Sequence, residues 1–200
     1  MGVFLLKEIN GIVLSWVVIS FCFSISSLFY EPSLFPITFI IYALTAGMGF
    51  LLHEIAHRTT ARRNGCYAYY QVWLWGLILA LFISIVSAGR FVFAALGAVY
   101  IEPMVLSSHI DEKGIRRVYG KISLSGPSMN ILLAIFFLFM MSLGGIVAEI
   151  SYAGLRINMW LAAFNLLPFP PLDGSKVFAW SKIVWAIFAV STWVFVLFTT

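Results

Sequence analysis

Long apolar runs separated by short polar segments dominate this sequence. The first run covers about 11–29, and the second starts near Pro36 and continues to Asn64. A helix needs about 20 predominantly apolar residues to cross the hydrocarbon core of a membrane. Later runs cover about 123–143, 154–168 and 177–198. The pattern predicts an all-α membrane protein, a polytopic helical bundle of about six transmembrane segments.

The stretch after the second run does not fit this pattern. Aromatic residues alternate from Cys66 to Trp75, which is typical of a strand, whereas Leu74–Ala88 is apolar but short for a crossing. Phe91–Ile101 fits a strand, a re-entrant segment or half of a hairpin, and the sequence leaves these alternatives open. We expect a short membrane-associated β-strand or a re-entrant region after the second helix, and then a polar loop over Ser107–Lys121.

Composition strengthens the membrane prediction and limits the number of domains. Hydrophobic residues make up 62% of the 200 residues and charged residues 10%, and the mean hydropathy is +1.01. Soluble domains use roughly half apolar and a quarter charged residues. We therefore expect one integral-membrane domain over residues 1–200, with the lipid bilayer as a partner. The net charge of +4 comes from basic residues in short loops, so nucleic acid is not an expected partner.

The basic residues predict which helix ends face the cytoplasm. They form four groups near the ends of apolar runs: Lys7; Arg58, Arg62 and Arg63; Lys113, Arg116, Arg117 and Lys121; and Lys176 with Lys182. All four groups lie on one side if residues 66–106 enter and leave on the same face. By the positive-inside rule that side is cytoplasmic. We expect a multi-pass protein with a cytoplasmic N-terminus.

Ionisable residues near the end of the second run indicate a metal site close to the cytoplasmic membrane edge. An ionisable side chain inside hydrocarbon is costly and usually functional. His53 and His57 are four residues apart, so both imidazoles project from one helix face and can bind one tetrahedral ion. Glu54 is displaced by about 100° from His53, so it lies beside the ion, where it can take a proton from water. This is the H-E-x-x-H arrangement of zinc peptidases.

A zinc site of this kind needs a third protein ligand, and Asp173 is the leading candidate. It belongs to the segment FNLLPFPPLDG, in which prolines break a helix next to an apolar run. Irregular backbone at membrane depth is tolerated where it lines a watery cavity, so an aspartate there can reach the ion. A plain Asp-Gly turn that stops a helix is the structural alternative. His109 is another candidate by residue type, but it lies in the polar loop.

Three motifs resemble those of the site-2 protease family of intramembrane zinc metalloproteases. They are HEIAH in the second predicted span, SGPSMN at the start of a later span, and FNLLPFPPLDG near the end. The motifs occur in the family order and cover a catalytic core of about residues 36–176. The resemblance implies that His53, His57 and Asp173 bind one zinc ion per chain and that Glu54 is the catalytic base.

Two asparagines are further site candidates. The resemblance suggests that Asn165 and Asn130 hold the substrate backbone or the developing oxyanion. Asn165 lies next to the helix break, so its amide can donate to an oxyanion, although capping the helix would serve equally well. Asn130 follows Pro127 in SGPSMN and faces inward, where hydrogen bonds between helices are an equal alternative.

The leading functional interpretation is an enzyme that hydrolyses peptide bonds within or near transmembrane segments of membrane protein substrates. A zinc-activated water would attack the carbonyl, with Glu54 as general base. The alternative is a non-proteolytic membrane zinc-binding or scaffolding protein that keeps the metal site. Glu54 argues against it, because zinc sequestration does not need a base beside the ligands. Membrane zinc proteases that act on prenylated C-termini usually take a glutamate as third ligand, and here the LDG context favours aspartate.

Overall fold

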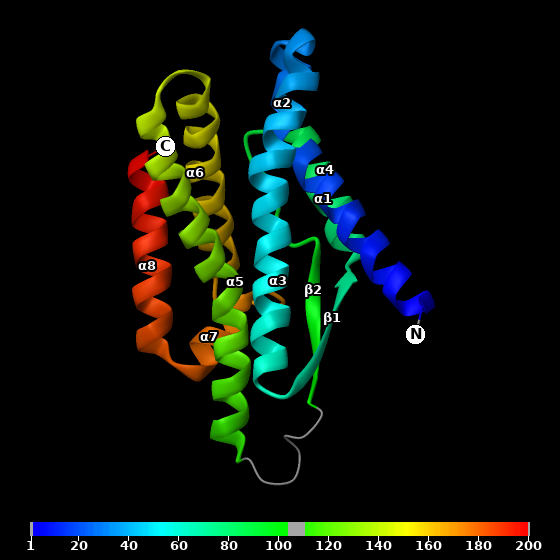
Figure 1. Ribbon diagram of the computed structural model, residues 1–200, viewed down its shortest axis with the longest axis vertical. Helices are drawn as coiled ribbons and strands as arrows, with labels where there is room; N and C mark the ends of the chain where they lie inside the picture. The colour runs from blue at the N-terminus through cyan, green and yellow to red at the C-terminus, as the bar shows by residue number, and fades with distance from the viewer. Residues whose placement is uncertain (1, 104–110, 200) are drawn as a thin grey trace.

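The computed structural model describes residues 2–103 and 111–199, and this part of the chain is mostly helical (Figure 1). The helices are α1 (Gly2–Tyr30), α2 (Phe35–Tyr42), α3 (Met48–Arg63), α4 (Leu74–Val86), α5 (Glu112–Met140), α6 (Gly145–Asn165), α7 (Asp173–Trp180) and α8 (Lys182–Thr199). The strands are β1 (Cys66–Val72) and β2 (Gly97–Pro103). Short 3₁₀ turns at Pro32–Leu34 and Met141–Leu143 precede α2 and α6.

Helices α2 and α3 form one long helix joined by a π-helical turn at Ala43–Gly47. Such a turn loosens the regular backbone hydrogen bonding, and here Trp16 Nε1 donates to the carbonyl of Ala43 at 3.1 Å. The helix ends at Arg63 because Gly65 adopts a φ of +72°, the left-handed conformation that terminates helices. The helix predicted from Pro36 to Asn64 is therefore present.

Three described helical segments are long and apolar enough to cross a membrane: Leu6–Tyr30, Pro32–Arg63 and Glu112–Leu143. The predicted number of about six transmembrane segments is not confirmed. Helix α4 has 13 residues, which span about 20 Å of a hydrocarbon core about 30 Å thick.

Several element boundaries differ from the predicted ones. Helix α5 begins at Glu112, inside the predicted loop Ser107–Lys121, and the Asp111 side chain caps it by accepting from Gly114 N at 2.9 Å. Helix α6 begins at Gly145 instead of near residue 154, and the predicted run 177–198 is interrupted at Ser181 between α7 and α8. The start of α5 was missed because its first turns contain exposed charged residues, such as Glu112 and Arg116, over which an apolar run does not extend.

The two strands form an antiparallel sheet in which Tyr69 pairs with Tyr100 and their rings stack, with centroids 5.9 Å apart. A strand beginning at Cys66 was predicted and is present as β1. Of the alternatives left open for Phe91–Ile101, the structure shows a strand, β2, which follows helix α4 and covers Gly97–Pro103. Helix α1 packs along β1. Glu8 on α1 accepts from Tyr70 N at 3.0 Å and pairs with Arg58 on α3, also at 3.0 Å.

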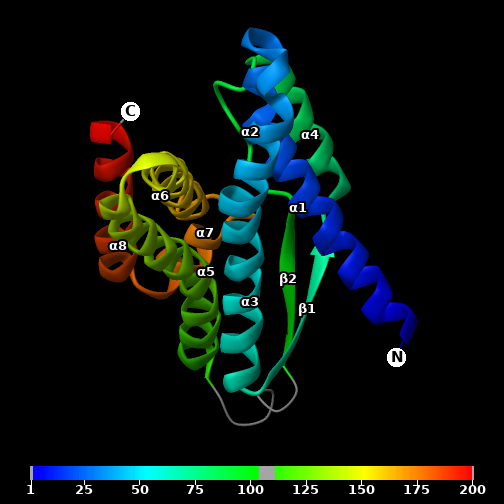
Figure 2. The same ribbon diagram turned by 45° about the horizontal axis from the view of Figure 1, so that its top comes forward.

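Helix α3 lies at the centre of the molecule in both views (Figures 1 and 2). It packs against α5 on one side and against the sheet on the other, and α5 in turn packs against α6 and α7. Figure 2 shows α5 to α8 as one group of helices and α1, α4 and the sheet as another. Side chains that project from α3 toward α5 and α7 therefore lie in the interior between these groups.

Candidate metal centre

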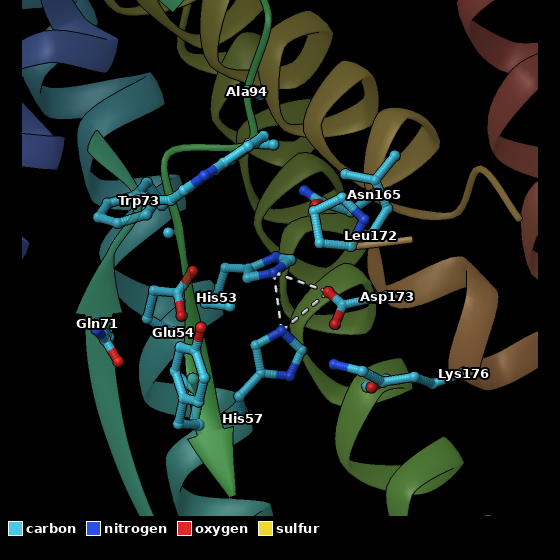
Figure 3. A pocket seen from close by; sticks show the side chains of 18 of the residues that line it. His53, Glu54, His57, Gln71, Trp73, Ala94, Asn165, Leu172, Asp173 and Lys176 are labelled. Carbon is cyan, nitrogen blue, oxygen red and sulfur yellow. Dashed lines mark hydrogen bonds and ion pairs between the residues drawn. The ribbon is translucent and has the colours of Figure 1, made fainter. Parts of the chain in front are cut away.

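Three side chains from two helices bring their ligand atoms together in the interior (Figure 3). His53 Nε2 and His57 Nε2, on α3, are 2.9 Å apart. Asp173 Oδ2, on the first residue of α7, lies 3.2 Å from His53 Nε2 and 3.0 Å from His57 Nε2. Both histidines are buried. The structure therefore places the two predicted histidines and the predicted aspartate around one point.

The ring orientation of His53 is set by a buried asparagine. His53 Nδ1 lies 2.6 Å from Asn130 Oδ1 on α5. The amide nitrogen of Asn130 donates to the Gly49 carbonyl at 3.2 Å and to Asn158 Oδ1 on α6 at 3.1 Å. Since the Gly49 carbonyl can only accept, the Asn130 oxygen must be the atom that faces His53, and His53 Nδ1 must carry the proton. Its Nε2 then carries no proton and has a lone pair available to bind a metal ion.

The same logic applies to His57. Its Nδ1 lies 2.7 Å from the backbone carbonyl of Ile122 on α5. A carbonyl oxygen is only an acceptor, so His57 Nδ1 carries the proton and its Nε2 is also unprotonated in the neutral ring. Metal-binding histidines use this arrangement, in which one ring nitrogen donates to a fixed partner and the other binds the ion.

The three converging atoms therefore fit a zinc ion. Two imidazole lone pairs and a carboxylate oxygen within 3.2 Å of one another repel unless a positive charge lies among them. In a tetrahedral zinc site with bonds of 2.0–2.1 Å, neighbouring ligand atoms are about 3.3 Å apart. Nitrogen and carboxylate ligands in a set of three suit zinc and leave a fourth position free.

A glycine from the SGPSMN segment allows the ligands to approach α5. A Cβ atom at Gly126 would lie 2.6 Å from His53 Nε2 and would also overlap His57 Nε2. The backbone of α5 thus comes directly against the two ligand nitrogens. Of the common residues, only glycine leaves this space open.

Glu54 lies beside the three ligand atoms and is not one of them. Figure 3 shows its carboxylate next to the His53 ring, outside the triangle that the three ligand atoms form. The side chain is buried, and its Oε2 has no hydrogen-bond partner among the described residues. An unpaired buried carboxylate oxygen is costly. Such an oxygen is free to accept a proton.

A cavity of about 490 Å³ connects these groups. It is lined by the three ligands, by Glu54, by the break between α6 and α7 and by five consecutive residues of β2, Gly97–Ile101. Asn165 lines it too, and one of its amide hydrogens goes to the Leu161 carbonyl at 3.0 Å. Figure 3 shows Lys176 reaching toward His57 and Asp173 from α7.

Comparison with known proteins shows the family to which this chain belongs. A protein of Methanocaldococcus jannaschii named "Putative zinc metalloprotease" is 37% identical over 184 residues, which cover 90% of this chain and 88% of the relative. The chain belongs to a zinc metalloprotease family. No protein-family model matches it, and no solved structure matches it at a significant level.

Some residues of this metalloprotease centre escaped the sequence analysis. Asn158 is entirely buried and completes the chain of hydrogen bonds to His53, yet nothing in its local sequence marks it. Gly126 belongs to the SGPSMN motif, but no role at the metal was predicted for it, whereas it lies inside α5 against both imidazoles. Asn130 faces inward as expected, but both of its amide hydrogens are used within the protein. His109 lies outside the described residues.

Proposed function

We propose that this metalloprotease is an intramembrane enzyme that cuts membrane protein substrates within or near their transmembrane segments. One observation carries the proposal: Glu54 and two of the three metal ligands, His53 and His57, lie on a helical segment, Pro32–Arg63, that is long and apolar enough to cross a membrane. His57 is about 8 Å and His53 about 14 Å along the helix axis from Arg62. Hydrolysis there takes place below the membrane surface.

In this proposal His53, His57 and Asp173 hold one zinc ion per chain. Bound zinc would supply a Lewis acid that polarises a carbonyl and lowers the pKa of water. The hydrogen bonds from His53 to Asn130 and from His57 to Ile122 keep both Nε2 atoms directed at the ion site. The protein thus fixes its ligands before a substrate arrives.

Glu54 acts as the general base. Its unpaired Oε2 accepts a proton from the water that attacks the scissile carbonyl, and the same proton then passes to the nitrogen of the leaving amine. Asn165 retains one amide hydrogen that no described contact uses, so this side chain can donate to the oxyanion. Asn130 has none left, and we assign it a positioning role.

The unpaired edge of strand β2 is the place where the substrate backbone binds in this proposal. A helical peptide hides its carbonyl groups in hydrogen bonds, so a substrate must be extended before it is cut. Residues Gly97–Ile101 line the cavity, and β2 pairs with β1 along one edge, which leaves its other edge without a strand partner among the described residues. An extended substrate can add to that edge. Strand β1 is less available for this role, because Glu8 of α1 accepts a hydrogen bond from its Tyr70 N.

The site-2 protease resemblance and the basic loops support a multi-pass protein whose site opens toward the cytoplasm. The cavity borders the Pro170–Asp173 segment, where water is expected to enter. A transmembrane substrate already in the bilayer would reach the same site from the side, between helices. One domain contains the whole arrangement.

Replacing Glu54 with glutamine tests the proposal. The purified wild-type and Glu54→Gln proteins would be compared for bound zinc and for cleavage of a synthetic single-span substrate in lipid vesicles. We expect the variant to keep its zinc, because the three ligands remain, and to lose at least about 100-fold in cleavage rate. Loss of zinc would make Glu54 a ligand, and unchanged cleavage would remove it from the chemistry.

The wild-type result separates this proposal from the alternative of a non-proteolytic zinc protein. Zinc bound at one per chain without cleavage of any membrane-spanning substrate would favour the alternative. A His57→Ala variant provides the matched control, since it should lose both zinc and cleavage.

A further inference from the structure

A second cavity of about 410 Å³ follows the one at the metal centre. Helix α1 contributes Ile19 to the first cavity and Phe23 to the second, and α6 contributes Leu161 to the first and Ile157 to the second. Residues four apart on a helix lie above one another on one face. The two cavities are therefore neighbours between α1 and α6, and we name the pair the corridor; its first cavity contains the catalytic site.

Two guanidinium groups line the second cavity. Arg156 lies near the middle of α6, and its Cζ is 5.5 Å from the centre of the Tyr152 ring. Arg90 follows α4, and its Nη2 is 3.5 Å from the Tyr30 hydroxyl. In the part of the chain that the structure describes, neither arginine forms an ion pair with a carboxylate. Most of the other lining residues are apolar or aromatic.

An arginine without an ion-pair partner in a mainly apolar cavity favours the binding of an anionic group. Charged groups inside a membrane bundle are costly and normally pair with an opposite charge. Arg156 is 11 residues from the start of α6 at Gly145, about 16 Å along the helix axis. Lipid phosphates lie at the bilayer surface, whereas a carboxylate on a transmembrane segment can lie at this depth. The candidate span Glu112–Leu143 ends just before α6 begins, so in the proposed arrangement Gly145 lies near a membrane surface. The depth of Arg156 below that surface favours a substrate side chain over a lipid phosphate.

We propose that the corridor binds the uncut part of the substrate's transmembrane segment and that Arg156, assisted by Arg90, selects segments with an aspartate or glutamate there. This inference rests on the proposed intramembrane proteolysis. Arg156 is nine residues from Asn165 at the catalytic end of α6, about 14 Å along the axis. The preferred acidic residue therefore lies about four to nine residues from the scissile bond, about four if that stretch is extended and about nine if it is helical.

Scanning one glutamate along a substrate tests the inference. Purified protein in phosphatidylcholine vesicles would receive single-span leucine-alanine segments carrying glutamate or glutamine at each position from three to twelve residues beyond the cleavage site. We expect the glutamate to glutamine ratio of cleavage rates to peak at about tenfold or more within the predicted window. In Arg156→Gln the ratio should fall to about one, and Arg156→Glu should prefer lysine at the same position. Arg116→Gln, on the exposed part of α5, is the matched control and should retain the peak.

A binding measurement keeps this test independent of hydrolysis. Fluorescence energy transfer between labelled segments and the Glu54→Gln protein would report affinity for the same glutamate and glutamine segments. Tighter, Arg156-dependent binding of the glutamate segment supports the inference even if nothing is cut, in which case only the proposed hydrolysis fails. Equal binding and cleavage of both segments overturns the inference and leaves the protease intact. An Arg156-dependent response to added phosphatidylglycerol, without preference for glutamate, would assign the site to lipid and also overturn it.

Discussion

Asn130 gives the sharpest test of how the metal centre is held. It is entirely buried and makes three hydrogen bonds: 2.6 Å to His53 Nδ1, 3.2 Å to the Gly49 carbonyl and 3.1 Å to Asn158 Oδ1. Asn130→Leu keeps a similar volume and removes all three. The His53 proton then has no acceptor, so the ring is free to rotate or to change tautomer, and Nε2 is no longer directed at the ion.

The size of the effect follows from these contacts. Loss of a partner behind a metal-binding histidine typically lowers metal affinity 10- to 100-fold, which equals about 1.4–2.7 kcal/mol. The substitution also leaves the Gly49 carbonyl and Asn158 Oδ1 buried without a donor. Each unsatisfied group costs about 1–3 kcal/mol of folding stability. We therefore expect weaker zinc binding together with a lower melting temperature of the metal-free protein.

Zinc affinity would be measured by competition with a chromophoric chelator, and unfolding by heating the detergent-solubilised protein with and without metal. Asn130→Asp separates the two effects, because an aspartate still accepts from His53 Nδ1 but donates to neither other partner. It should bind zinc within a few-fold of the wild type while unfolding at a lower temperature. If Asn130→Leu binds zinc as tightly as the wild type, the hydrogen bond from His53 does not position the ligand.

Three further predictions address the space at the ligands, the metal itself and the orientation in the membrane. Gly126→Ala should weaken zinc binding at least about tenfold without unfolding the protein, measured by the same competition, because its Cβ would occupy the space of both Nε2 atoms. Chelation of a zinc ion present at 1,000 times its Kd should lower the free energy of unfolding by about 4 kcal/mol, and an unchanged melting temperature would exclude a structural contribution of the metal. A Pro171→Cys variant lacking Cys22 and Cys66 should react with a membrane-impermeant thiol reagent added from the cytoplasmic side, whereas reaction only from the other side would reverse the orientation.

The local part of the metal centre could be predicted from the sequence because helical periodicity fixes it. His53 and His57 share a face in any regular helix, and Glu54 follows at a fixed angle. Asp173 was predictable because the prolines before it break a helix at a point where only a cavity tolerates such a backbone. Each of these predictions depended on neighbours within about ten residues.

The remaining features depend on contacts between distant segments. Asn130 and Asn158 are 28 residues apart, and their hydrogen bond exists only because α5 packs against α6. Gly126 faces the imidazoles because α3 crosses α5 at that point. The apolar stretches between residues 72 and 103 are short enough to suit a helix or a strand alike. Only the pairing with β1 decides where β2 begins.

The hydrogen bonding of the buried polar groups relates this packing to the proposed catalysis. In an interior without bulk water, a buried polar atom that lacks a partner is costly, and the described residues contain three such side-chain atoms: Glu54 Oε2, Arg58 Nε and Ser84 Oγ. Among these three residues, Glu54 alone lines the cavity of the metal centre. Its close neighbours His53 and Asn130 are, by contrast, tied into a continuous hydrogen-bond chain. The fold thus pairs the groups around the ligands and leaves one carboxylate oxygen unpaired, at the place where the proposed hydrolysis needs a proton acceptor.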